Sequence, residues 1–228
     1  MPATTPVFLA FATASLLASL ALPAGAAIVV GQTDDFENGT LLGWDSGSRN
    51  PNGPTNVPSG GPAGANDHFL HLTSNGSSGA GGKLVVFNAD QWTGDYLGAG
   101  VTSIRMQVDN LGATNLALRL ILEGGAGRLT TVDPVTVPAG SGWETVSFSL
   151  TSANLTGGNF NAVMGQVSTL DLVHSPSAIA FRSSAPNIAA VLGVDNITAV
   201  PEPGALLLTA IGLAALVCSV GRKRSAGA

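Results

Sequence analysis

Alternating apolar and polar positions mark short strands in the middle of the chain. Ile104, Met106 and Val108 are separated by polar residues, so they fall on one face of an extended segment. The same two-residue period recurs over residues 116–122 and 146–150. Each of these segments therefore predicts a strand with one buried face and one polar face.

Short apolar runs between turn residues predict the remaining strands, at residues 68–73, 83–87, 128–132, 178–182 and 191–200. Phe160, Val163 and Met164 have helical spacing, which predicts a short helix over residues 159–167. Residues 45–66 are rich in Pro, Gly, Asn and Ser and predict a long surface loop. Many short strands with one small helix indicate an all-β fold, a single antiparallel β-sandwich of the jelly-roll type.

The chain also has an apolar stretch at each end. Residues 7–22 precede the small residues 23–27, which is typical of a signal peptide cut after Ala26 or Ala27; an uncleaved anchor is the alternative. Residues 204–221 carry no charge and form a helix of about 27 Å, just long enough to span a bilayer. We therefore divide the chain into a signal peptide (1–27), a sandwich domain (28–199) and a tail (200–228).

Charge and cysteine content narrow the possible partners. Of nine Lys and Arg residues, six lie between residues 28 and 200, together with thirteen of the fourteen Asp and Glu residues. Nucleic acid is an unfavourable partner for this acidic domain, because phosphates require a clustered basic surface. The one cysteine, Cys218, lies in the tail, so the domain has no disulfide and depends on its core for stability.

The tail resembles a bacterial sorting signal. Val200-Pro201-Glu202-Pro203 precedes the apolar segment and Arg222, Lys223 and Arg224 follow it, an order that resembles the PEP-CTERM signal of bacteria that export exopolysaccharide. The basic cluster favours the cytoplasmic side, so the domain faces outward. The resemblance implies an exosortase-type processing enzyme as partner, transient membrane anchoring, and a final location at the cell surface or in the extracellular matrix. A C-terminal anchor that is never cut is the alternative.

Three further segments resemble galactose-binding-like jelly rolls, which include carbohydrate-binding modules. They are residues 36–44 (Phe-Glu-Asn-Gly-Thr-Leu-Leu-Gly-Trp), 142–146 (Gly-Trp-Glu-Thr-Val) and 194–197 (Val-Asp-Asn-Ile). The resemblance implies a structural calcium ion where the first and last strands meet, with Glu37 and Asp195 among its ligands. Calcium takes six to eight oxygens, so backbone carbonyls and water would complete the shell. Alternatively, both carboxylates are simply exposed turn residues.

No catalytic constellation is evident in the sequence. His68 and His71 are three positions apart on a predicted strand and so face opposite sides, which does not suit a shared zinc ion. Asp171, His174 and Ser175 are interpreted as polar loop residues, because no nucleophile motif surrounds them. A pair of carboxylates for glycoside cleavage leaves no local pattern and stays open. We expect a protein that is not an enzyme.

Sugar binding is the favoured alternative to catalysis. Trp92 and Tyr96 lie among amide and carboxylate residues in the segment 88–96, a combination that suits the apolar faces and hydroxyls of a sugar. The competing interpretation is that Trp92 fills an edge of the core. We therefore expect an exported surface or matrix protein with a carbohydrate-binding domain. A structural matrix protein without a defined ligand, or less readily a polysaccharide-degrading enzyme, is the alternative.

Overall fold

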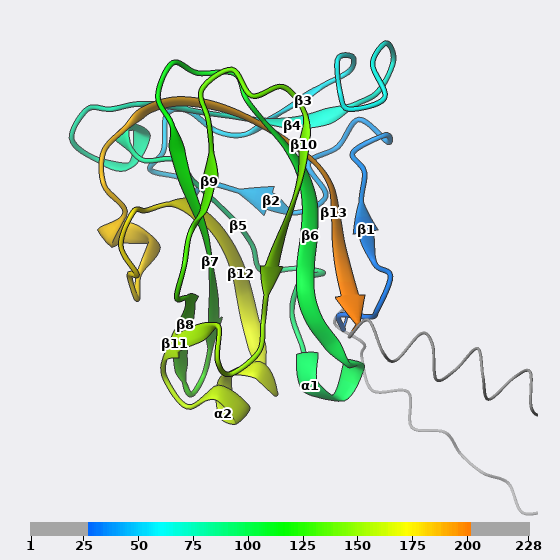
Figure 1. Ribbon diagram of the computed structural model, residues 1–228, viewed down its shortest axis with the longest axis vertical. Helices are drawn as coiled ribbons and strands as arrows, with labels where there is room; N and C mark the ends of the chain where they lie inside the picture. The colour runs from blue at the N-terminus through cyan, green and yellow to red at the C-terminus, as the bar shows by residue number, and fades with distance from the viewer. Residues whose placement is uncertain (1–26, 202–228) are drawn as a thin grey trace, which may run out of the picture.

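The computed structural model describes residues 27–201, which form two antiparallel sheets packed face to face (Figure 1). The first, here called the β13 sheet, has the order β10-β6-β13-β4-β3, and β1 pairs with the far end of β13. Its strands are β1 (Thr33–Asp34), β3 (Thr55–Val57), β4 (Phe69–Asn75), β6 (Val101–Asn110), β10 (Glu144–Ser149) and β13 (Ala189–Pro201).

The second sheet, here called the β12 sheet, has the order β11-β8-β7-β12-β5-β2, and β9 pairs with β7. Its strands are β2 (Trp44–Asp45), β5 (Val85–Asn88), β7 (Leu116–Gly124), β8 (Gly127–Thr131), β9 (Val135–Val137), β11 (Leu155–Gly157) and β12 (Val167–His174). Apart from the pairs β3–β4 and β7–β8, strands that are adjacent in space are not consecutive in sequence, which is the connectivity of a jelly roll.

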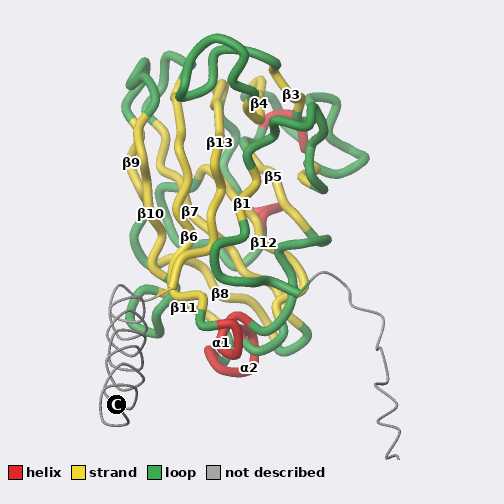
Figure 2. Tube along the Cα trace, turned by 90° about the vertical axis from the view of Figure 1, so that its right-hand side faces the viewer, coloured by secondary structure: helices red, strands yellow, loops and turns green. Residues whose placement is uncertain are grey.

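Two short helices lie together at one end of the sandwich, α1 (Tyr96–Ala99) and α2 (Phe160–Met164) (Figure 2). Asp95 and Asn159 begin them, each accepting a backbone N–H with its side chain. Two single-turn 3₁₀ helices, η1 (Ala80–Gly82) and η2 (Arg182–Ser184), lie in loops.

The predicted alternation places the core correctly. Ile104, Met106 and Val108 on β6 have no exposed surface, and they face the inner residues of β7, Leu118, Leu120 and Leu122, which are equally buried. The polar residue between them on β6, Arg105, is exposed. The predicted antiparallel β-sandwich is therefore confirmed.

Two predicted elements are wrong, and the error concerns one region. Residues 178–182 do not form a strand; they belong to a loop that includes η2. The preceding residues, predicted as a helix end and a polar loop, form the long strand β12. Asp171 and His174 are consequently buried strand residues rather than loop residues. The long predicted loop 45–66 contains a short edge strand, β3, and begins within β2.

The membrane prediction lies outside the described residues. No helix within residues 27–201 is long and apolar enough to cross a bilayer. Residues 1–26 of the predicted signal peptide (1–27) and the whole predicted helix 204–221 fall in the undescribed ends. So do the sorting-motif residues other than Val200 and Pro201, which are the last two residues of β13.

Candidate functional site

Asp171 lies on the outer face of the β12 sheet, in the middle of its central strand. Its neighbours Leu170 and Leu172 point into the core, so the Asp171 side chain points away from it. It is opposite Ile121 on β7 and Phe87 on β5. Its exposed fraction is nevertheless 0%, because residues 175–188, here called the 175–188 loop, cover this face. The loop is the gold segment that follows β12 in Figure 1.

Buried and partly buried hydrogen bonds connect the 175–188 loop to neighbouring segments. Arg119 on β7 is only 3% exposed, and its guanidinium donates to the carbonyls of Ser175 (2.8 Å) and Pro176 (2.9 Å). Lys83 donates from Nζ to the carbonyl of Ala185 at the other end of the loop. The loop is therefore held at both ends, and its middle is positioned over Asp171.

Arg182 extends from this loop onto the sheet and contacts three side chains. Its Nη1 lies 2.9 Å from Asp171 Oδ1 and 3.4 Å from Glu123 Oε1. Its guanidinium also lies over the ring of Phe87, 4.1 Å from the centroid. A planar cation in such a position is attracted by both the carboxylates and the ring face.

A second arginine, on the neighbouring strand β8, also lies between a carboxylate and an aromatic ring. Arg128 on β8 is opposite Glu123 in the sheet register, and its Nε lies 3.1 Å from Glu123 Oε1. Its guanidinium lies 4.4 Å from the ring centroid of Phe181, the residue before Arg182. Phe181 is 49% exposed. The outer face of the β12 sheet thus presents two arginines, two phenylalanines and two carboxylates in mutual contact, here called the arginine–aromatic cluster (Phe87, Glu123, Arg128, Asp171, Phe181 and Arg182).

Burial strongly affects the protonation of Asp171. Loss of solvent raises the pKa of Asp171 to about 7, and the nearby Arg182 guanidinium opposes that rise. Asp171 Oδ1 accepts from Arg182, whereas Oδ2 is buried without a hydrogen-bond partner among the described residues. A carboxyl group of this kind is protonated in a substantial fraction of molecules near neutral pH.

A pocket of about 370 Å³ adjoins the cluster through Arg182. Arg49 and Lys83 also line it, together with the polar residues Ser46, Asn50 and Ser183. Val85, two residues before Phe87 on the same face of β5, forms part of its floor. The pocket and the cluster are therefore one continuous surface on the outer side of the β12 sheet.

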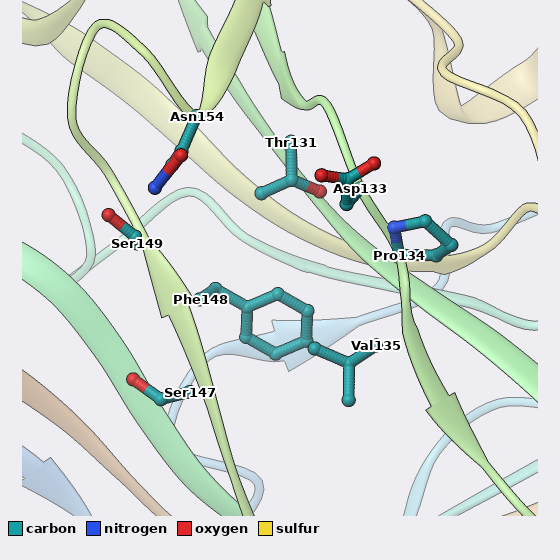
Figure 3. A pocket seen from close by; sticks show the side chains of 8 residues that line it. All are labelled: Thr131, Asp133, Pro134, Val135, Ser147, Phe148, Ser149 and Asn154. Atoms are coloured by element: carbon teal, nitrogen blue, oxygen red, sulfur yellow. The ribbon is translucent and has the colours of Figure 1, made fainter.

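Two other depressions are present on the described surface. One of about 490 Å³ lies on the outer face of the β13 sheet, with Arg105, Gln107, Thr145 and Thr198 in its lining. Another of about 230 Å³ lies at an edge of the sandwich, where Asp133, Asn154 and three hydroxyl residues surround the ring of Phe148 (Figure 3). Phe148 is only 3% exposed, so this edge pocket offers no open ring face.

Trp92 and Tyr96 do not form the predicted sugar-facing surface. Both have an exposed fraction of 0%. The indole N–H groups of Trp92 and Trp44 each donate to Asp34 Oδ2 at 2.7 Å, and the Tyr96 hydroxyl donates to the Trp92 carbonyl at 3.0 Å. The prediction of exposed rings is therefore wrong for this conformation, and the competing interpretation, that Trp92 fills an edge of the core, is correct.

Glu37 and Asp195 do lie in one acidic region, where the chain after β1 meets β13. Burial, together with the nearby carboxylates of Asp67, Glu37 and Asp35, raises the pKa of Asp195 to about 7. Asp195 is 1% exposed, and among residues 27–201 its side chain accepts only from Asn196, at 2.7 and 2.8 Å. Glu37 Oε1 accepts from the backbone N–H of His68.

The negative charge of this region would attract a cation, but its side chains alone do not provide a set of metal ligands. Among residues 27–201 no three His, Cys, Asp or Glu side chains lie close enough together to hold a metal ion. Phe36, Asn66 and Asn196, each next to one of these acidic residues, have positive φ angles, so the backbone here is held in an uncommon conformation. Calcium at Glu37 and Asp195 would need backbone oxygens and water as well, and it stays a proposal.

His71 lies on β4 and His68 just before it, and both are partly buried. His68 Nδ1 lies 2.8 Å from Asn56 Oδ1, and the His71 ring is at the edge of the Phe69 ring, with centroids 6.3 Å apart. Of the three polar residues considered as a triad, His174 Nδ1 accepts from the Ala117 amide, and Ser175 Oγ donates to the Ser177 carbonyl. These contacts fix the end of β12 and leave no nucleophile beside a base.

No family model matches this chain, and no curated protein matches it. Among solved structures it is similar to an exo-beta-agarase, with a TM-score of 0.56 and 13% identity over 76% of this chain. The chain spans only 26% of the length of that agarase. At this identity the similarity shows a shared fold.

The chain is also similar to two carbohydrate-binding modules. One is a family 11 module from Clostridium thermocellum, solved with a beta-1,3-1,4-mixed-linked tetrasaccharide (TM-score 0.48, 14% identity, 77% of this chain and 98% of that one). The other is a non-crystalline cellulose specific module, CBM28 (TM-score 0.49, 13% identity, 78% and 96%).

Proposed function

We propose that the domain binds polysaccharide without cleaving it, through the arginine–aromatic cluster on the outer face of the β12 sheet. The observation that carries this proposal is the exposed ring of Phe181. The Arg128 guanidinium lies 4.4 Å from the centroid of this ring and holds it beside the other charged groups of the cluster. An aromatic face packs on the C–H face of a sugar, and neighbouring arginines and carboxylates bind its hydroxyls.

The cluster is suited to binding because it is already organised. Arg182 is held by Asp171 and Glu123, and Arg128 is held by Glu123. Side chains that are fixed before a ligand arrives lose little conformational entropy when it binds. The pocket lined by Arg49 and Lys83 extends this surface beyond a single sugar ring.

A hydrolase is the less favoured function for the same cluster. Asp171 and Glu123 are two carboxylates near each other, and a raised pKa such as that of Asp171 suits a general acid. However, the same Arg182 nitrogen contacts both carboxylates, and Asp171 has no exposed surface. The guanidinium therefore occupies the space between the two acids that a glycosidic oxygen and a water molecule would need.

The location of the protein is part of the proposal and rests on the sequence of its ends. The signal peptide exports the domain, the PEP-CTERM tail anchors it transiently, and an exosortase-type enzyme releases it to the cell surface or exopolysaccharide matrix. Mass spectrometry of the mature protein tests this. A mature chain that begins near residue 27 and lacks residues 204–228 supports it; an intact chain in the cytoplasm contradicts it.

Native gel electrophoresis of the full chain in mild detergent, in gels that contain the producing organism's exopolysaccharide, agarose or mixed-linked β-glucan, tests the binding function. We expect retardation in at least one gel. Phe181→Ala should weaken that binding about three- to tenfold, as expected for the loss of one stacking face. Released sugar should not accumulate during incubation with the same polymers.

Leu111→Ala is the matched control, because Leu111 is also 49% exposed but lies after β6, outside the cluster. It should leave the retardation unchanged. Migration of the wild-type chain without retardation in all three gels would contradict sugar binding, and concentration-dependent self-association would then favour a structural matrix protein.

A further inference from the structure

The six cations of the described domain are unevenly distributed, and three of them meet at one place. Arg49, Lys83 and Arg182 all line the pocket of about 370 Å³ beside the arginine–aromatic cluster. The domain as a whole is strongly acidic. Grouping half of its positive charges around one depression costs electrostatic free energy unless negative charge is nearby, in the protein or in a ligand.

Within the described part of the chain, acidic side chains pair with only one of these three cations. Arg182 is paired with Asp171 and Glu123, whereas within residues 27–201 neither Arg49 nor Lys83 has a carboxylate within salt-bridge distance. Asp45 precedes the pocket residue Ser46 but directs its Oδ1 to the amides of Ser46 and Gly47. The pocket lining itself contains no acidic residue.

An unpaired hydroxyl in the same pocket is an independent observation. The Oγ atom of Ser46 is buried and has no hydrogen-bond partner among the described residues. A buried hydroxyl without a partner is costly and calls for an explanation, and a group that enters the pocket and hydrogen-bonds to it would supply one. Asn50 and Ser183 add an amide and a second hydroxyl to the lining.

From these contacts we infer that the polysaccharide is anionic, and that the pocket binds a carboxylate or sulfate substituent of a sugar residue. Arg49 and Lys83 supply the charge, Ser46 Oγ supplies a hydrogen bond, and Arg182 joins this subsite to the cluster where the sugar ring stacks. This inference rests on the proposed sugar-binding function and specifies its ligand. The preference follows from the cations, whereas affinity for the sugar ring follows from Phe181.

Two pairs of polymers that differ in charge test the inference with the full chain in mild detergent. Polygalacturonate is compared with its methyl ester, and a sulfated galactan, κ-carrageenan, is compared with neutral agarose. We expect tighter binding to one of the charged polymers by about tenfold or more, with the carboxylate and sulfate pairs showing which anion is preferred. Added NaCl should reduce the difference, because the charges are close to the surface.

Arg49→Gln is the decisive variant, because the Arg49 side chain makes no hydrogen bond among the described residues and its loss should leave folding intact. It should remove most of the preference for the charged polymer, because it should weaken binding to the charged polymer much more than binding to the neutral one. Lys83→Gln should act in the same direction, although it also loses the contact with the Ala185 carbonyl. The melting temperature of the Lys83→Gln protein shows how much of its loss of binding comes from a less stable loop.

Arg105→Gln is the matched control, since Arg105 is an exposed arginine on the outer face of the other sheet. It changes net charge equally and should alter binding less than twofold. Equal binding to charged and neutral polymers, or equal effects of Arg49→Gln and Arg105→Gln, would overturn the inference while leaving sugar binding intact. Binding to none of the polymers would instead contradict the proposed function.

Discussion

The Nη1 atom of Arg182 lies 2.9 Å from Oδ1 of Asp171, and through this contact a residue of the 175–188 loop is paired with a fully buried carboxylate of β12. Because Arg182 is partly exposed and Asp171 is not, the pair joins the surface of the candidate site to the sheet beneath it. The protonation of Asp171, the position of the loop and the exposure of Phe181 therefore depend on one another.

Replacing Arg182 should destabilise the fold in a pH-dependent way. Arg182→Met leaves Asp171 buried without its cation, which should lower the free energy of unfolding by about 2–3 kcal/mol at pH 8. The loss should be smaller at pH 5, where a protonated Asp171 needs no cation. Urea unfolding at both pH values measures this. Arg105→Met, which removes an exposed arginine, should change stability by less than about 0.5 kcal/mol at either pH. Equal losses for Arg182→Met at both pH values would disprove the coupling.

The wild-type protein should lose stability as the pH rises from about 4 to about 7. Asp171 and Asp195 each have a folded-state pKa of about 7 against an ordinary value of 3.8. Between these values the folded state binds more protons than the unfolded state, so stability falls with increasing pH and levels off above the folded pKa. Each group should lower the melting temperature by roughly 3–8 °C over this interval.

Thermal melting in excess chelator, from pH 4.5 to 8.5, measures this effect without interference from bound cations. Asp171→Asn and Asp195→Asn should each remove part of the slope, because an amide does not titrate. A melting temperature that rises between pH 5 and 8 in the wild-type protein, or Asn variants with the full slope, would contradict the assignment.

The sandwich could be predicted because most of its strands bury only one face. On β6, Ile104, Met106 and Val108 alternate with polar residues, and the structure has the same alternation of burial. The glycine-rich turn after β7 predicted the connection between β7 and β8. The predicted fold class therefore depended on the strands whose outer face is in contact with solvent.

The candidate site was missed because its central strand breaks that pattern. Every residue of β12 except Ser168 is buried, since the 175–188 loop covers the outer face, and no two-residue period remains. Conversely, residues 178–182 are a short apolar run followed by an arginine and were therefore predicted as a strand, although they belong to the 175–188 loop. Asp171, Phe181 and Arg182 thus fell in segments whose structure was assigned wrongly, and Glu123 is brought to them only by the sheet register.

The exposure of individual aromatic residues was also predicted wrongly, because the local sequence does not show whether a side chain is buried. The polar residues around Trp92 suggested a binding loop, but one of the most important partners of its ring is Asp34, 58 positions away. The sequence signal for Phe181 was no more than an isolated aromatic residue beside an arginine. Such pairs become informative only when the fold places an arginine and a carboxylate opposite them.

Removing the buried carboxylate of Asp34 should destabilise the core. Asp34→Ala removes the acceptor of two indole N–H groups at 2.7 Å and of the Gln91 amide at 3.0 Å. The free energy of unfolding should therefore fall by about 3–4 kcal/mol. Trp92→Ala should cost about 3–5 kcal/mol by opening a cavity. Urea denaturation measures both. Asp90→Ala removes an exposed carboxylate from the same region and should cost less than about 0.5 kcal/mol.

These variants also separate a structural role from a role in sugar binding. At temperatures where Trp92→Ala remains folded, its retardation in polysaccharide gels should equal that of the wild-type chain. Selective loss of binding by a folded Trp92→Ala protein would show that the buried ring becomes exposed to the ligand and would restore the original prediction.

Calcium should stabilise the protein if Glu37 and Asp195 help to hold it. The carboxylates of Asp35, Glu37 and Asp67 act on Asp195, and a divalent cation would relieve their repulsion and lower the pKa of Asp195. At pH 7.5, about 1 mM calcium should raise the melting temperature by several degrees relative to excess chelator, as expected for binding to the folded state alone.

Asp195→Asn should abolish most of this increase and Glu37→Gln should reduce it, because each removes a charged oxygen ligand. Asp171→Asn is the control, since it removes a buried carboxylate of similar pKa on the other sheet, and it should retain the full response. Elemental analysis of the purified chain should find calcium in the wild-type protein and less in Asp195→Asn. The same increase in both Asn variants would show that calcium acts elsewhere, and no response in the wild-type protein would remove the metal site.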